Sequence, residues 1–281
     1  MEGQDKPSAF TPMFEQFRAE LDEHHDRRER ITKASRDITA ASKKIGTAIQ
    51  PVAMEDRTDT CGSVRTLNKP VPQHAAKSNK PYYDIIKAQY AVVSEDLQGL
   101  NAWRYNRQIT GGCQEWMEAA CFQHYLESAT LLSYEDASEK LRALDEDGPG
   151  IRLSPEDWVL GVYDMTGELM RFAITAMATS GELPSISASE PDTMDVDAGG
   201  SSGARNVLTD MRGLRAALEG VNVGGYGSFA KDVGQKMRVM QTSVEKVEKA
   251  LYGLIVRGAE RPKGWMPDMD SGGGRQVEVE G

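Results

Sequence analysis

The chain has 281 residues, of which 39% are hydrophobic and 27% are charged, and its 33 Lys and Arg against 43 Asp and Glu give a net charge of −10. A chain of this length can bury its own core without help from a metal or a disulfide. The acidic balance argues against a protein that holds nucleic acid through bulk positive charge, although a local basic patch is compatible with it.

Several classes of protein are excluded by composition and spacing. No apolar run approaches the roughly 18 residues that a membrane span needs, and the first residues lack the features of an export signal. We therefore expect no membrane association. The cysteines Cys61, Cys113 and Cys121 lack CxxC spacing and the four histidines form no HxxxH pair, so we interpret the cysteines as reduced intracellular thiols.

The predicted elements are helices throughout. Apolar positions that step by three and four residues predict a long helix from Phe14 to Ile49. Prolines in residues 50–80 indicate a loop, and a second helix is expected after Pro81. Further helices are predicted over 112–128, 133–144, 155–179, 205–219 and 233–258, with Ser154 as an N-cap and Pro155 at the first helical position. An acidic segment at 181–205 reads as a second loop.

These elements predict an all-α, single-domain bundle of about seven helices that occupies residues 12–258. Residues 1–11 and 259–281 are expected to be disordered ends. No strand-period run, internal repeat or phosphate-binding glycine motif competes with this interpretation.

A basic segment lies within the long first helix. Between Arg27 and Lys44 the chain carries seven basic residues and only two acidic ones. A solvated helix face and a surface that contacts phosphates both fit this pattern. The candidate nucleic-acid contacts are Arg27, Arg28, Arg30, Lys33, Arg36, Lys43 and Lys44.

Two acid pairs border the packing faces of two helices. Glu115 and Glu118 are three residues apart, and Asp164 and Glu168 are four apart, so each pair lies on one side of its helix. Four carboxylates that met without a counter-ion would repel one another strongly. A set of oxygen ligands without His or Cys fits Mg²⁺ or Mn²⁺, and phosphodiester hydrolysis is the reaction that such a site favours. Solvated helix faces also carry such pairs, so the pattern alone leaves both interpretations open.

Four blocks of the chain, in order, resemble the trax branch of the translin family: residues 35–39, 114–125, 157–171 and 246–258. The resemblance implies a translin-like fold that assembles with translin into a barrel-like hetero-oligomer. It further implies a Mg²⁺-dependent endoribonuclease that acts on single-stranded RNA, in removing passenger strands in RNA silencing or in processing transfer-RNA fragments. The catalytic and metal-binding acids of the family match Glu115, Glu118, Asp164 and Glu168.

The chain lacks the basic N-terminal extension that we associate with nuclear import in animal members, so the expected location is the cytoplasm, with the nucleus as an open second location. Its long loops match no family motif. Two other functions stay open: a non-catalytic RNA-binding partner of translin, and a purely structural adaptor.

Overall fold

The computed structural model describes residues 10–52, 67–186, 205–224 and 227–258. Within these ranges the chain forms eight α-helices and one short 3₁₀ helix. Their bounds are α1 Thr11–Val52, α2 Gln73–Val93, η1 Glu95–Leu97, α3 Leu100–Arg104, α4 Asn106–Ser128, α5 Tyr134–Arg142, α6 Pro155–Ser180, α7 Val207–Glu219 and α8 Ser228–Gly258. The predicted disordered ends and the central parts of both predicted loops lie outside the described residues, apart from Phe10 and Thr11.

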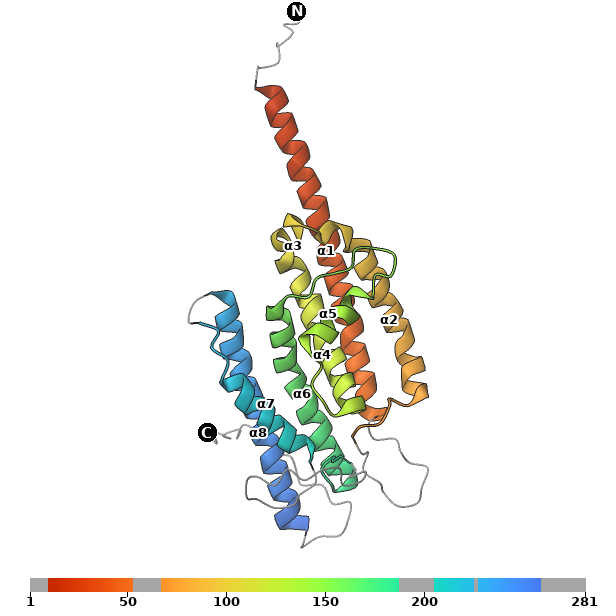
Figure 1. Cartoon of the computed structure of the whole chain (residues 1–281), viewed down its shortest axis with the longest axis vertical. Coiled ribbons are helices and arrows are strands. Elements are labelled where there is room, and N and C mark those ends of the chain that lie inside the picture. Colours follow the sequence, from red (N-terminus) through yellow and green to blue (C-terminus); the bar gives the residue numbers. More distant parts are fainter. Residues whose placement is uncertain (1–9, 53–66, 187–204, 225–226, 259–281) are drawn as a thin grey trace, which may run out of the picture.

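Five long helices lie side by side in the order α2, α1, α4, α6 and α8 (Figure 1). The hydrophobic core runs between them. Ile31, Ile38 and Ile45 of α1 are at most 1% exposed, and the rings of Phe122 and Phe172 join α4 to α6 with centroids 6.3 Å apart. Burial of each such side chain stabilises the fold by about 1.5–3 kcal/mol. The all-α prediction is confirmed.

Helix α1 is longer than the bundle that it joins. It has 42 residues, which corresponds to about 63 Å at 1.5 Å per residue. Its first turns project beyond the other helices (Figure 1), and Phe14 and Leu21 there are 64% and 67% exposed. The same apolar stripe that is buried from Ile31 onward therefore lies in solvent at the start of the helix.

Helices α1 and α4 run parallel and approach closely at a glycine. The backbone N–H of Gly112 donates to Ser35 Oγ at 3.0 Å, and a Cβ at Gly112 would lie 3.1 Å from the backbone oxygen of Ser35. Ser35 is buried, and its hydroxyl is also 3.4 Å from the carbonyl oxygen of Ile109. Because buried polar groups need partners, this contact sets the position of one helix along the other.

The caps of α6 agree with the sequence. Ser154 Oγ accepts from the backbone N–H of Asp157 at 3.0 Å, Pro155 occupies the first helical position, and Gly181 ends the helix in the left-handed conformation at φ +74°. These signals are local, which is why they could be recognised without knowledge of the packing.

The loop predicted over residues 50–80 ends earlier in the structure than the sequence suggested. Helix α2 begins at Gln73 and continues through Pro81, although an internal proline loses a backbone hydrogen bond and costs about 3 kcal/mol. The buried side chains Ala75, Ile86 and Tyr90 pack one face of α2 against the core, and this packing offsets the cost.

Two further differences concern the connection to α4. Helices η1 and α3 were not predicted, and α4 begins at Asn106 rather than near Gly112.

The described part of the chain contains isolated bridges, Leu67 with Ile186 and Ser185 with Asn206, but no strand. None of the described helices has both the length and the apolar character required to cross a bilayer.

Candidate functional site

The four predicted acids lie on the two central helices, α4 and α6. Gly161 allows these helices to approach: a Cβ there would lie 3.3 Å from the carbonyl oxygen of Gln114 and 3.4 Å from the backbone nitrogen of Glu118. Asp164 follows Gly161 by one helical turn, so the close contact carries it towards Glu118. A side chain at position 161 would therefore press the two acid-bearing helices apart.

The raised pKa of Glu118 reflects the proximity of the two acid pairs. Burial raises its pKa most, and the nearby carboxylates of Asp164, Glu115 and Glu168 raise it further, to about 8. At neutral pH and without a cation, Glu118 is therefore mostly protonated. Glu168 is only 7% exposed, which places the cluster at the edge of the core rather than on an open surface.

Basic side chains contact the other three acids. Lys43 of α1 has its Nζ 3.2 Å from Glu115 Oε1. Lys236 of α8 donates to Asp164 Oδ2, and Arg171 donates to Glu168 Oε1.

These ion pairs affect the acids differently. Burial raises the pKa of Asp164, while the contact with Lys236 and the charge of Lys43 oppose that rise. Lys43, a predicted RNA contact, lies at the acidic cluster in the structure, and its role in binding RNA stays a prediction. Lys236 was missed, because a contact across 72 residues depends on how α6 packs on α8.

A divalent cation fits the chemistry of this donor set. As the side chains lie, the described residues contain no group of three or more His, Cys, Asp or Glu arranged to hold a metal. The cluster nevertheless raises the pKa of the half-buried Glu118, and three basic side chains contact the other acids, as is typical of a site with excess negative charge. Oxygen ligands and excess negative charge are what Mg²⁺ and Mn²⁺ prefer.

A second polar contact fixes the start of α6 against α4. Asp157 is 3% exposed, and its Oδ1 accepts from the hydroxyl of Thr110 and from Gln114 Nε2 at 2.9 Å. Gln114 precedes the first acid, Glu115. Asp157 was not singled out from the sequence, so its role in joining the two acid-bearing helices was missed.

The basic segment of α1 does not form one continuous surface. Arg27 and Arg30 both bind the carboxylate of Asp96, at 3.0 Å and 2.8 Å. Arg28 contacts His25, and the Lys44 ammonium lies 5.4 Å from the centre of the Tyr82 ring.

Two members of the basic segment stay available. Lys33 and Arg36 are exposed and form no ion pair with any residue in the described ranges. They precede Lys43 by ten and seven residues, or about 15 Å and 10 Å along the helix. Their positions therefore lead along α1 towards the acidic cluster.

The two described cysteines are free and buried. Burial raises the pKa of Cys113 and of Cys121 to about 12, so both stay as thiols. Cys61 lies outside the described residues.

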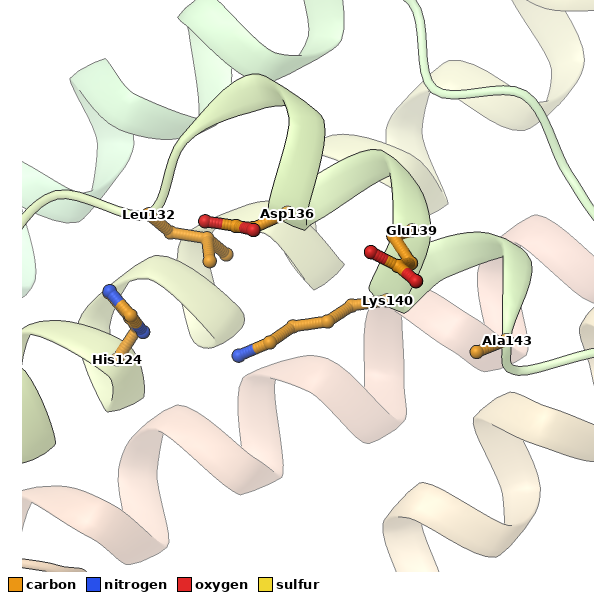
Figure 2. Close-up of a pocket in the computed structure, with 6 residues that line it drawn as sticks. All are labelled: His124, Leu132, Asp136, Glu139, Lys140 and Ala143. Atoms are coloured by element: carbon orange, nitrogen blue, oxygen red, sulfur yellow. The ribbon is translucent and has the colours of Figure 1, made fainter.

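An open hollow of about 220 Å³ lies between the end of α4 and helix α5 (Figure 2). None of the four acids lines it. Asp136 at its rim accepts from Ser133 Oγ at 2.8 Å as part of the cap of α5, and burial, together with the charge of Lys140, lowers the pKa of His124. The lining residues are His124, Leu132, Asp136, Glu139, Lys140 and Ala143.

The comparisons with known proteins point to one family. The sequence model of the translin family matches residues 26–258. Translin-associated protein X of Rattus norvegicus is 28% identical over 291 residues, covering 96% of this chain and 87% of the rat protein. Translin of Mus musculus is 22% identical over 246 residues, covering 88% and 92%.

The fold has a counterpart among solved structures. The crystal structure of apo-NeC3PO superposes with a TM-score of 0.54 at 13% identity and covers 90% of this chain and 100% of that chain. The family match at residues 26–258 extends over most of the chain. The chain therefore belongs to the translin family.

Proposed function

We propose that the chain is the catalytic subunit of a complex with translin, and that it is a metal-dependent endoribonuclease acting on single-stranded RNA. The observation that carries the proposal is the meeting of four carboxylates from α4 and α6, which together with burial raises the pKa of Glu118 to about 8. Relatives named Translin-associated protein X support the family relation, and their name states an association with translin.

Glu115, Glu118 and Asp164 are the residues that would hold Mg²⁺ or Mn²⁺. When bound, the cation would acidify a water molecule and offset charge on the scissile phosphate. Glu168 is buried and its carboxylate accepts from Arg171, so it would either add a ligand oxygen or orient the attacking water.

The exposed side chains of Lys33 and Arg36 support an RNA path along α1. A charged phosphate backbone would follow these groups towards the acids through contacts that weaken with salt. This part of the proposal also fits the alternative function, a partner of translin that binds RNA without cutting it.

An RNA cleavage assay distinguishes the endoribonuclease from the partner that binds RNA without cutting it. The chain is co-expressed with a translin from the same organism, and a labelled single-stranded RNA is incubated with the complex in Mg²⁺ or in EDTA. The proposal expects cleavage in Mg²⁺ and none in EDTA. RNA that is retained but stays intact in both buffers supports the binding partner, and a complex that neither cuts nor retains RNA supports the structural adaptor.

A further inference from the structure

Two basic helices flank the two acidic helices of the bundle. The acids lie on the central helices α4 and α6, and the two lysines that contact them come from the flanking helices α1 and α8 (Figure 1). Lys43 and Lys236 therefore close the cluster from its two sides. Neither helix needs a lysine there for packing, because their core positions are apolar.

The two lysines differ from the third basic group of the cluster. Arg171 lies one turn after Glu168 on the same helix, so their ion pair is fixed by the helix itself. The lysine pairs connect different helices through flexible four-carbon stems, and a lysine ammonium is a compact charge that water solvates strongly. Such a group can leave a carboxylate without disturbing the backbone that carries it.

We propose that Lys43 and Lys236 are exchangeable counter-ions, which neutralise the acids while no divalent cation is bound and move to a phosphate of the RNA when one is. This inference rests on the proposed function. A divalent cation carries twice the charge of an ammonium, so it competes for the same carboxylates. The displaced lysines then lie beside the bound cation, where a phosphate oxygen would need a positive partner.

The burial of the two lysines ranks their effects. The side chain of Lys236 is 23% exposed, whereas that of Lys43 is 63% exposed. A charge that is less solvated is less screened, and exposed lysine–carboxylate pairs contribute little. Lys236 should therefore be the stronger competitor for the cation.

The test measures Mn²⁺ affinity and RNA affinity on the full-length chain, in the assembly in which it purifies. Mn²⁺ binding is followed by electron paramagnetic resonance. RNA binding is followed by fluorescence anisotropy of a single-stranded oligonucleotide in Ca²⁺, with a gel to verify that the RNA is intact. Lys236→Met should bind Mn²⁺ about tenfold more tightly, because a competing charge is gone, and the RNA several-fold more weakly. Lys43→Met should change both affinities in the same directions by smaller factors.

Two control variants test whether a change in Mn²⁺ affinity comes from the lost charge rather than from a disturbed fold. Lys231→Met removes an exposed lysine from the same helix that makes no ion pair with a described residue, and it should leave Mn²⁺ affinity within twofold of wild type. Lys236→Gln removes the charge but keeps a polar side chain, so it should reproduce the tighter Mn²⁺ binding even if the methionine variant folds poorly.

The outcomes separate this inference from the proposed function. Saturable Mn²⁺ binding by the wild type, with equal or weaker binding by both Lys236 variants, overturns the counter-ion role and leaves the metal site standing. Tighter Mn²⁺ binding without any loss of RNA affinity overturns the transfer to phosphate. A wild-type chain that binds no Mn²⁺ overturns the metal site of the proposed function together with this inference.

Discussion

At the scale of single residues, environment gives four similar carboxyls different states. Glu115, Asp164 and Glu168 each have a basic side chain within contact, whereas Glu118 lies among the other three acids and its carboxyl is kept mostly protonated. A bound cation would offset the neighbouring negative charges and favour the ionised form of Glu118. Its central position makes it the most informative residue to change.

Glu118→Gln should abolish most of the RNA cleavage and leave the fold intact. The amide has nearly the shape of the protonated carboxyl but cannot supply a charged ligand, so Mg²⁺-dependent cleavage should fall about a hundredfold or more. Cleavage is measured on a labelled single-stranded RNA with translin present, and size-exclusion chromatography verifies assembly.

Glu127→Gln is the matched control for that change. Glu127 lies nine residues beyond Glu118 on α4, about 13 Å along the helix, where its carboxylate accepts from Gln123. Its cleavage rate should stay close to wild type. Equal rates in the two variants would remove the acidic cluster from the mechanism.

The described cysteines should be unreactive in the native protein. Because burial raises the pKa of Cys113 and Cys121 to about 12, both are protonated at pH 8, and their sulfur atoms are out of reach of a reagent. In a Cys61→Ser background, a thiol reagent at pH 8 should label no cysteine natively and two in denaturant. Rapid native labelling would show that α4 opens readily.

The residues of the site differ in how far the sequence predicts them. Spacing alone places Glu115 beside Glu118 and Asp164 beside Glu168, because helix geometry is local. The contact of Lys236 with Asp164 joins residues of different helices, and no local pattern specifies it.

At the scale of elements, the long helices were predictable and the exceptions have identifiable causes. Apolar stripes predict α1, α6 and α8 because each helix buries one face where it joins the bundle. The start of α2 was wrong because core packing overrides the penalty of Pro81, and α3 has only five residues, too few to show a period. The spacing between α4 and α6 depends on one glycine that periodicity cannot single out.

Gly161→Ala should weaken both the fold and the metal site. The added methyl group would press against Met117 and the backbone of α4, which costs about 1–3 kcal/mol of unfolding free energy when the core cannot yield. A wider gap between the acid pairs should also lower Mn²⁺ affinity about tenfold, as misplaced ligands do. Thermal unfolding in EDTA and Mn²⁺ titration measure the two effects.

The same methyl group at Gly167 provides the comparison. Nothing lies within 4 Å of a Cβ there, so Gly167→Ala should stabilise α6 by about 0.5–1 kcal/mol through its helix propensity. If Gly161→Ala unfolds at the wild-type temperature and binds Mn²⁺ as tightly, the close approach does not set the distance between the acids.

At the scale of the whole molecule, apolar surface is left uncovered at both ends of the bundle. Phe10, Phe14 and Leu21 are 64–67% exposed on the projecting part of α1, where the core-facing stripe continues into solvent (Figure 1). Tyr252 and Ile255, 70% and 66% exposed, lie near the opposite end on α8. Contiguous apolar surface of this kind marks a protein interface, which agrees with a chain that works in a complex.

The isolated chain should therefore associate with itself, and translin should convert it into a defined hetero-oligomer. The double variant Phe14→Ser, Phe17→Ser removes two neighbouring rings whose centroids are 6.4 Å apart, so it should reduce self-association and also weaken co-assembly with translin. Because Phe14 and Phe17 are 64% and 49% exposed and lie outside the hydrophobic core, the unfolding temperature of the chain should change little. Val92→Ser, at a position of α2 that is 57% exposed, is the control for a loss of apolar surface elsewhere. Light scattering coupled to size exclusion gives the mass of each species.

A double variant that forms the same hetero-oligomer with translin at the same concentrations would show that the projecting helix is not part of the interface. The exposed end of α8 would then be the surface to change.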